Sequence, residues 1–235
     1  MQDFADAFHL AFALLARLDP DLVEIVTLSL QVTLSAVVLS CAIGFPAAAA
    51  LAAAKFPGRT VVIVILNTMM SLPPVVIGLL VYMLISNAGP LGFLRLLYTP
   101  GAMILAQTIL VTPLVAALGR QVLADLHDEY DETFRSMAVP WRKKVAALLW
   151  DARYSLLTVA LAGFGRAVAE VGAVIIVGGN IDRLTRVMTT AIALETSRGD
   201  LALALALGIV LLVVAVTINA AVMVLRASAQ RLAHV

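Results

Sequence analysis

Two opposite charges inside an apolar stretch are the residues of this chain best placed to act on a solute. Arg166 and Glu170 lie four residues apart in the segment AGFGRAVAEVGAVIIVGGN. In an α-helix this spacing places both side chains on one face. Because an unpaired charge inside a bilayer is costly, we expect the two to face protein or water and to screen each other. The pair would then border a solute path or hold its gate, or else form a buried pair that only fixes helix packing.

The remaining sequence shows no pattern typical of an enzyme. His9, His127 and His234 are far apart and lack metal-ligand spacing. We find no nucleophile–base arrangement, no GxxxxGK[ST] phosphate loop and no dinucleotide-binding fingerprint. A bare anion filter would carry an excess of Arg or Lys, whereas Arg166 and Glu170 roughly cancel. We therefore expect a chain that binds no metal or cofactor and does not itself hydrolyse ATP, and its net charge of +1 argues against a nucleic-acid partner.

The composition indicates that these charges lie in an integral membrane protein. Hydrophobic residues make up 62% of the 235 residues and charged residues 13%, whereas soluble domains are roughly 45–50% apolar and about 25% charged. Crossing a bilayer takes about 20 helical residues, and the backbone of a spanning segment must satisfy its own hydrogen bonds. The sequence thus predicts an all-α, multi-pass membrane helix bundle of about five transmembrane helices. The expected spans cover residues 25–54, 60–94, 96–119, 154–178 and 201–225.

One long polar block, residues 120–153, separates the third and fourth expected spans. It reads RQVLADLHDEYDETFRSMAVPWRKKVAALLWDAR. The block is too charged to span a bilayer, and its residues favour helix too strongly for a flexible linker. Ten of the sixteen Lys and Arg residues fall on its side of the membrane, five on the other, and Arg166 within a span. Because positive residues favour the cytoplasmic side, we expect the block and the C-terminus inside, and the N-terminus and residues 87–101 and 179–200 outside. A structured charged loop of this kind is typically offered to a soluble partner.

The N-terminal segment, residues 1–19, is expected to form an amphipathic helix. Its apolar residues recur at helical spacing, and Asp3 and Asp6 stand where a signal peptide needs a basic region. The helix would lie at the membrane surface or pack against the bundle. The sequence leaves both arrangements open.

Prolines predict where the spans bend. Pro46 lies in the first span, and Pro73 and Pro74 lie together in the second, within SLPPVVIGLL. Proline removes an amide donor and clashes with the preceding helical turn, so each site should bend or break its helix. Pro73 and Pro74 are the stronger candidates for a functional gate, with a static packing kink as the alternative. Further along, we expect the VGGN segment to end the fourth span, and a short external helix to be capped by Thr185 and ended by Gly199.

The polar block resembles a known loop. Residues 128–153 resemble the EAA loop of ABC-importer permeases, which runs Glu-Ala-Ala, three variable residues and Gly. Glu132 matches the glutamate, Thr133 and Phe134 replace the two alanines, and Ala138 stands at the glycine position.

A second, longer segment narrows the resemblance. GFGRAVAEVGAVIIVGGNIDRLTRVMTTAIALETSRGDLALALALG is similar almost throughout to tungstate-specific ABC permeases, and LPPVVIGLLVYMLIS and GPLGFLRLLYTP fit the same subfamily. The resemblance covers about residues 20–228, which we expect to be a type 1 ABC transmembrane domain between the N-terminal segment and a C-terminal tail of residues 229–235. It implies a permease subunit, multi-pass in the cell membrane.

The resemblance also implies partners and residue roles. Two copies of this subunit would form the path, two ATPase subunits holding ATP and Mg would sit beneath it, and an extracytoplasmic binding protein would deliver the oxyanion. The ATPase would contact a coupling helix near Glu132–Trp141 and rock the spans as it closes. The residues expected to contact it are Glu132, Arg135, Ala138 and Trp141. Those expected to form the path and gate are Arg166, Glu170, Pro73 and Pro74.

Three other functions remain open at the level of sequence. A self-sufficient secondary carrier would show internal repeats and ion-coupling residues, and no clear repeat is present. A non-transporting membrane scaffold would leave residues 128–153 without a partner. A permease for molybdate, sulfate or another anion would have the same architecture, and binding by its extracytoplasmic protein would decide between the anions.

Overall fold

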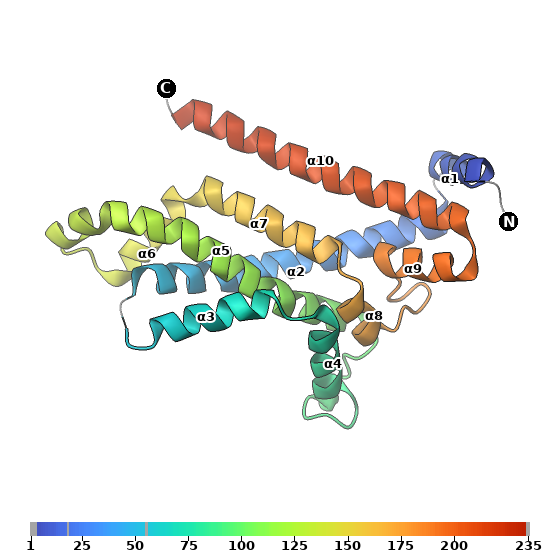
Figure 1. Cartoon of the computed structure of the whole chain (residues 1–235), viewed down its shortest axis with the longest axis horizontal. Coiled ribbons are helices and arrows are strands. Elements are labelled where there is room, and N and C mark those ends of the chain that lie inside the picture. The colour runs from blue at the N-terminus through green and yellow to red at the C-terminus, as the bar shows by residue number, and fades with distance from the viewer. Residues whose placement is uncertain (1–3, 18, 55, 234–235) are drawn as a thin grey trace. The chain divides into compact units, whose positions relative to one another are not determined.

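Helices account for all the regular structure of the described chain. The computed structural model describes residues 4–17, 19–54 and 56–233, which contain ten α-helices, one short 3-10 helix and no strand. Figure 1 shows their course. In chain order they are α1 (Phe4–Arg17), α2 (Pro20–Ala53), α3 (Arg59–Met70), α4 (Pro74–Ile85), η1 (Gly92–Leu94), α5 (Pro100–Ser136), α6 (Trp141–Asp151), α7 (Arg153–Val168), α8 (Gly172–Gly178), α9 (Met188–Arg198) and α10 (Leu201–Ala233).

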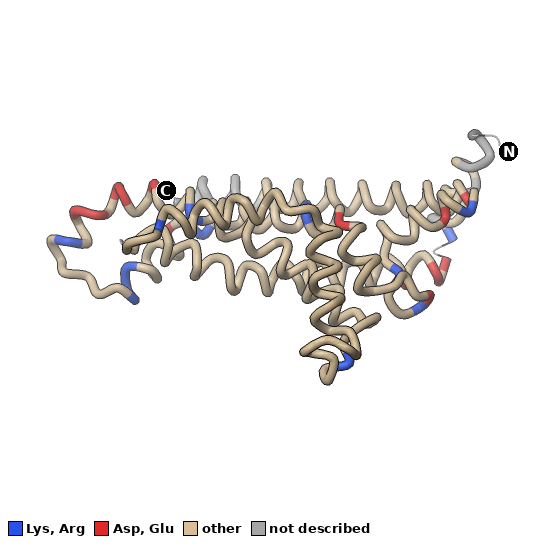
Figure 2. The backbone as a smooth tube through the Cα atoms, turned by 60° about the horizontal axis from the view of Figure 1, so that its bottom comes forward, with Lys and Arg blue, Asp and Glu red and all other residues tan. Residues whose placement is uncertain are grey.

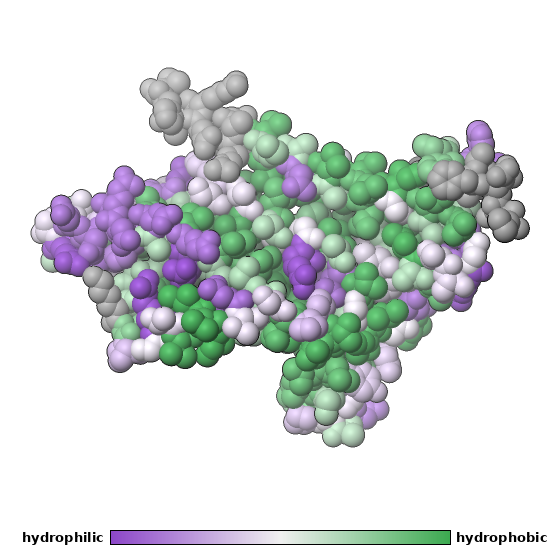
Figure 3. All heavy atoms as spheres, in the orientation of Figure 1, coloured by the Kyte–Doolittle hydropathy of each residue, from purple (hydrophilic) through white to green (hydrophobic). Residues whose placement is uncertain are grey.

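Three of these helices are each long and apolar enough to cross a membrane. They are α2, α5 and the Leu201–Val224 part of α10. Two bent pairs pass the same test together: α3 with α4, bent by 100°, and α6 with α7, bent by 73°. Counting each bent pair as one span gives up to five spans in the described chain, so the predicted all-α, multi-pass architecture is confirmed. Figure 2 shows charged residues gathered on residues 120–153 and long uncharged stretches elsewhere, and Figure 3 shows hydrophobic residues over the spans.

The chain divides into two compact units, each with its own core. The first unit comprises Met1–Ala36, Pro73–Gln107 and Ala167–Ile218. Its core joins α1, α2, α9 and α10 through Ala11, Leu22, Ile25, Met188, Ala191, Ala206 and Leu207. Ala11 is fully buried there while its neighbour Phe12 is 59% exposed. The N-terminal helix is therefore present and packs against the helices of this unit.

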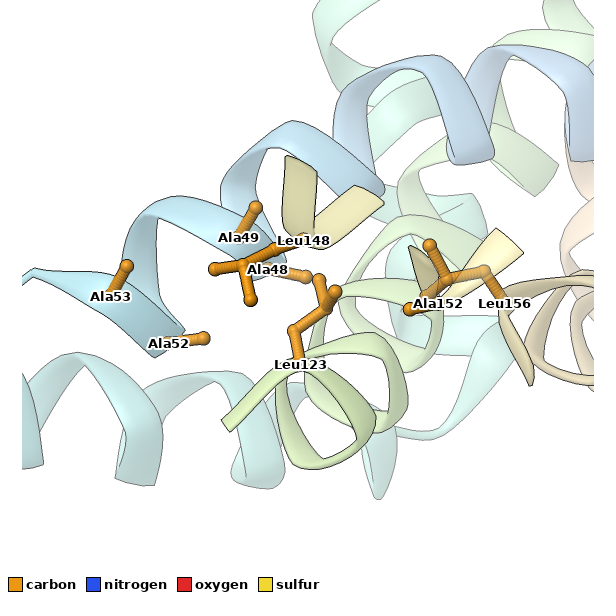
Figure 4. Close-up of a cluster of buried hydrophobic side chains, with 8 residues drawn as sticks. All are labelled: Ala48, Ala49, Ala52, Ala53, Leu123, Leu148, Ala152 and Leu156. Carbon is orange, nitrogen blue, oxygen red and sulfur yellow. The ribbon is translucent and has the colours of Figure 1, made fainter. Parts of the chain in front are cut away.

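The second unit comprises Val37–Leu72, Thr108–Arg166 and Asn219–Val235. In its core, small side chains of α2 meet larger ones of α5, α6 and α7 (Figure 4). The members are Ala48, Ala49, Ala52, Ala53, Leu123, Leu148, Ala152 and Leu156. A Cβ on Gly119 of α5 would lie 3.2 Å from the Cβ of Ala48. Small residues thus let α2 and α5 approach closely, as is common between membrane helices.

The predicted break at the two adjacent prolines is confirmed. Pro74 is the first residue of α4, and Pro73 is its N-cap with extended φ and ψ of −61° and 126°. A residue that precedes proline is pushed out of the helical region, and proline itself fits the first helical position. By contrast, α2 continues through Pro46 without ending.

The fourth expected span differs from its prediction. It was expected to be a single helix over residues 154–178 that is interrupted only by the charges of Arg166 and Glu170, but α7 ends at Val168 and α8 begins only at Gly172. Gly179 ends α8 with φ of 72° and Gly199 ends α9 with φ of 84°, as predicted. Thr185 does not cap α9, whose N-cap is Val187. Its hydroxyl instead donates to the Gly178 carbonyl and accepts from the Ile181 N–H, which closes the loop after α8.

Candidate functional site

Glu170 lies in the three-residue break between α7 and α8, with its side chain buried. Its Oε1 accepts a hydrogen bond of 3.1 Å from the Ala173 N–H in the first turn of α8. Its carbonyl oxygen accepts one of 2.8 Å from the Thr189 hydroxyl at the start of α9. A carboxylate on an otherwise unpaired helix N–H satisfies a group that would be costly to bury alone. Glu170 therefore bonds to the first turn of α8 through its side chain and to the start of α9 through its carbonyl oxygen.

A small polar pocket adjoins Glu170 within the first unit. Its volume is about 10 Å³, which is room for roughly one water molecule and not for a tetrahedral oxyanion. Its polar lining comes from four helices or loops: Ser29 and Thr33 on α2, Gln107 on α5, Glu170 before α8 and Thr189 on α9. A solute path at this point is closed in the conformation described.

Gln107 is a buried polar residue of this pocket. It is 3% exposed, and its Nε2 donates to the Ala167 carbonyl at 3.1 Å. Its Oε1 is buried and has no hydrogen-bond partner in the described part of the protein. A buried acceptor without a partner is costly, so the pocket holds a group ready to accept a hydrogen bond. Ser29 is already engaged, since its Oγ accepts from the Met188 N–H at 2.7 Å and donates to the Ile25 carbonyl.

The spacing argument that paired Arg166 with Glu170 is wrong for this structure. Arg166 lies exposed in the last turn of α7, and the helical repeat ends at Val168, before Glu170 is reached. The two residues therefore do not share a helical face. Glu170 finds its hydrogen-bond partner in the backbone of α8.

The helix that follows Pro73 and Pro74 leads directly to this region. In α4, a Cβ on Gly78 would lie 2.7 Å from the Cα of Ala173 in α8. A Cβ on Gly172 would lie 2.7 Å from a methyl carbon of Val75. The two backbones are thus nearly in contact, and the proline bend and Glu170 are brought together through α8.

The four residues expected to couple to an ATPase lie around one turn of the second unit. α5 ends at Ser136 and α6 begins at Trp141, so the polar block is mostly helical. Glu132 and Arg135 lie exposed on the last turns of α5, and Ala138 lies in the turn. Arg135 and Trp141 line a groove of about 480 Å³ with Ala53, Ala54, His127, Asp131 and Lys144. Glu132 and Ala138 are not among its lining residues.

Asp131 holds α5 and α6 together at this groove, and the sequence interpretation missed it. Its carboxylate pairs with Arg135 on α5, and one oxygen lies 3.9 Å from Lys144 Nζ on α6. The same Lys144 Nζ lies 5.2 Å from the centre of the Phe134 ring. Between the same two helices, the Asp151 carboxylate of α6 raises the pKa of the Tyr130 phenol of α5. The spacing of four residues between Asp131 and Arg135 was the available signal.

The polar residues of the pocket were also missed. Ser29 and Thr33 are four residues apart in the first span, and Gln107 is the one amide of the third. Polar side chains inside a span are a signal of function or of hydrogen bonding between helices. Within the described part of the chain, no three His, Cys, Asp or Glu side chains cluster closely enough to bind a metal ion.

Comparisons with known proteins agree with this architecture. No family model matches the chain. The chain is 36% identical over 222 residues to the tungstate uptake system permease protein TupB of Peptoclostridium acidaminophilum, covering 94% of this chain and 97% of the relative. It is 38% identical to a probable anion ABC transporter permease protein of Haloferax volcanii, covering 85% and 88% of the two chains. It is 39% identical to TupB of Campylobacter jejuni, covering 70% of this chain and 69% of that one.

These similarities extend over nearly the whole chain and both units. The chain is a multi-pass membrane permease subunit. It belongs to the family of anion ABC-transporter permeases that includes the tungstate uptake permeases.

Proposed function

We propose that this chain forms the transmembrane path of an ATP-driven importer for tungstate. The observation that carries the proposal is the 36% identity with a tungstate uptake permease over 94% of the chain. Two copies of the chain enclose the path, and an extracytoplasmic binding protein delivers the oxyanion to its outer face. Molybdate is the alternative substrate, because it is a near-identical tetrahedral dianion and the Haloferax relative is named only for an anion.

The turn between α5 and α6 is the contact for the partner ATPase, which holds the ATP and Mg. Glu132, Arg135, Ala138 and Trp141 form that contact. Two features support the assignment: α5 and α6 are held together by Asp131, and the groove beside them is open and about 480 Å³ in volume. A rigid pair of helices transmits a displacement, whereas a flexible loop would absorb it.

The gate lies where α4 packs against α8, next to Glu170 and the start of α9. Glu170 and Arg166 border the path, and the bend at Pro73 and Pro74 lets α4 move with α8. α5 supports this coupling, since one uninterrupted helix runs from Pro100 past Gln107 to Ser136. Closure of the ATPase dimer displaces the α5–α6 turn, and rocking of the helices opens the small polar pocket. The polar block and the C-terminus face the cytoplasm, and the N-terminus faces outward.

Reconstitution tests the proposed function directly. Proteoliposomes carrying this chain with its ATPase and binding protein should accumulate tungstate only when ATP is hydrolysed. Vesicles that lack the ATPase should accumulate none. Equal uptake without the ATPase would instead identify a secondary carrier, and a binding protein that prefers molybdate over tungstate would change the substrate.

The coupling contact is tested by a bulky substitution at the turn. Ala138→Trp should abolish co-purification of the ATPase and its stimulation. Ala146→Trp, on an exposed position of α6 outside the turn, should leave both intact. Normal co-purification and stimulated ATP hydrolysis with Ala138→Trp would exclude the turn as the contact.

A further inference from the structure

A wide apolar groove in the second unit lies outside the proposed ATPase contact and the proposed gate. It runs between α2 on one side and α6 and α7 on the other, with a volume of about 580 Å³. This is the size of a small-molecule site, for which 300–1,000 Å³ is typical. It is lined by Val37, Val38, Cys41, Ala42, Phe45, Pro46, Leu149, Arg153, Leu156, Leu157 and Ala160.

Arg153 is the one charged side chain among these lining residues, and it is held in place by aromatic rings. Its guanidinium carbon lies 4.7 Å from the centre of the Trp150 ring and 4.5 Å from that of Tyr154. It donates a hydrogen bond of 2.7 Å to the Trp150 carbonyl and one of 3.5 Å to the Tyr154 hydroxyl. Stacking on two rings fixes the orientation of the planar guanidinium and leaves its remaining N–H groups to a ligand.

No acidic side chain neutralises this cation within the described chain. The ion pairs formed among the described residues do not include Arg153. Arginine presents a fork of donors that matches a phosphate group. The groove therefore combines an apolar wall with the guanidinium of Arg153, whose N–H groups can bind a phosphate and whose charge no acidic side chain of the described chain neutralises.

The place of Arg153 in the chain suits a membrane interface. It is the first residue of α7 and the last residue of the charged block, and α7 carries no further charge before Arg166. Trp150 is 68% exposed beside it, and Trp and Tyr are enriched where a membrane meets water. The lining residues of α7 extend from Arg153 to Ala160, which is roughly 10 Å of helix running away from the interface.

We propose that this groove binds an anionic phospholipid of the cytoplasmic leaflet, with its phosphate on Arg153 and an acyl chain along α2 and α7. A net negative headgroup is favoured over a zwitterionic one because Arg153 is not neutralised by the protein. A lipid is favoured over a helix of a second copy. An apolar helix laid over the groove would bury the Arg153 charge without a counter-charge, which is costly.

Native mass spectrometry of the detergent-purified permease–ATPase complex tests the headgroup preference. Phosphatidylglycerol and phosphatidylcholine with identical acyl chains are added in turn. The wild type should retain phosphatidylglycerol about fivefold more tightly, the size of effect expected for one basic residue near a lipid headgroup.

Arg153→Gln should abolish the difference. Arg142→Gln, which removes an exposed charge of α6 outside the groove, should preserve it. Equal retention of the two lipids by the wild type would overturn the proposal, as would an unchanged preference in Arg153→Gln.

A second measurement uses the wild-type chain and its single cysteine, Cys41, which lines the groove. Phosphatidylglycerol should slow alkylation of Cys41 by N-ethylmaleimide more than phosphatidylcholine does. Ala160→Trp, which fills the groove, should slow the reaction without lipid and remove the effect of lipid. Protection of Cys41 that follows protein concentration and ignores added lipid would assign the groove to a second copy and overturn the proposal.

Discussion

Ala138 occupies a backbone conformation that is better suited to glycine. Its φ is +48°, in the left-handed region, at the turn that joins α5 to α6. For a residue with a Cβ this region is strained, whereas glycine enters it freely. The family loop that residues 128–153 resemble has glycine at this position. The left-handed conformation thus supplies a backbone reason for glycine at this position of the family loop.

Replacing Ala138 with glycine should therefore stabilise the turn. The gain expected from removing the left-handed strain is about 1 kcal/mol, seen as a higher Tm of the detergent-purified chain. Ala146→Gly is the matched control, because Ala146 lies in regular α6 and glycine in a helix interior should cost about 1 kcal/mol. A Tm that falls equally in both variants would show that the turn does not require the left-handed conformation.

Glu170 allows the roles of its hydrogen bond and of its charge to be separated. Glu170→Ala removes the acceptor of the Ala173 N–H and should lower stability by about 1 kcal/mol, as for the loss of a helix cap. Glu170→Gln keeps an acceptor oxygen and should keep the Tm close to that of the wild type while reducing tungstate uptake. Thermal unfolding and vesicle uptake measured on both variants check this. Wild-type uptake by Glu170→Gln would mean that the carboxylate serves only as a cap.

The incorrect pairing of Arg166 with Glu170 shows that residue spacing alone does not predict a break in a helix. Residues 169–171 are Ala, Glu and Val, and they contain no proline or glycine that would mark the break in the helix. The break depends on a tertiary fit: Gly172 and Gly78 permit α8 and α4 to touch, and Glu170 satisfies the freed N–H. Neither contact can be inferred from the local pattern of apolar and polar residues.

At the scale of elements, α4 and α8 approach each other closely beside the proposed gate. A Cβ on Gly78 would lie 2.7 Å from a backbone carbon of Ala173, closer than real Cβ contacts allow. Backbone cannot move aside as the end of a flexible side chain can. The two helices must therefore separate if Gly78 acquires any side chain.

Gly78→Ala should consequently destabilise the first unit and impair uptake. The expected loss of stability is about 1–3 kcal/mol, the usual range for overpacking, and thermal unfolding of the purified chain measures it. Gly208→Ala on α10 is the control in the same unit: nothing lies within 4 Å of its added Cβ, so it should be neutral or slightly stabilising. Identical Tm values for Gly78→Ala and the wild type would contradict the close approach.

Element boundaries set by local chemistry were predictable, and those set by polarity alone were not. Pro74 begins α4, and Gly179 and Gly199 end α8 and α9 because their backbone requirements are local. The third span was expected to end at residue 119, where the charges begin, and the point at which α5 itself ends, Ser136, was not predicted. Charged residues such as Arg and Glu are good helix formers, so a change from apolar to charged marks the membrane surface without ending the helix.

At the scale of the whole molecule, the length of α5 bears on how the chain sits in the membrane. It has 37 residues, and a straight helix of that length is roughly 55 Å long, whereas the hydrocarbon core is about 30 Å thick. Its C-terminal turns must leave the membrane, and they carry the charges of the polar block. Ten of the sixteen Lys and Arg residues lie on this side of the expected spans and five on the other, which favours the cytoplasmic side. The fold class followed from composition, but the orientation of the chain in the membrane follows only from this bias of basic residues.

Cysteine labelling decides the orientation. In a Cys41→Ser background, which is free of other cysteines, Ser136→Cys places a thiol at the exposed end of α5 and Ser197→Cys places one at an exposed position of α9. A membrane-impermeant maleimide added to intact cells should label Ser197→Cys and should reach Ser136→Cys only after the membrane is opened. Because both sites are exposed serines on helix ends, their reactivities in detergent should be similar, which makes any difference in cells a difference of side. Labelling of Ser136→Cys in intact cells would put the α5–α6 turn outside, away from cytoplasmic ATP, and would remove the basis for an ATPase contact at Ala138.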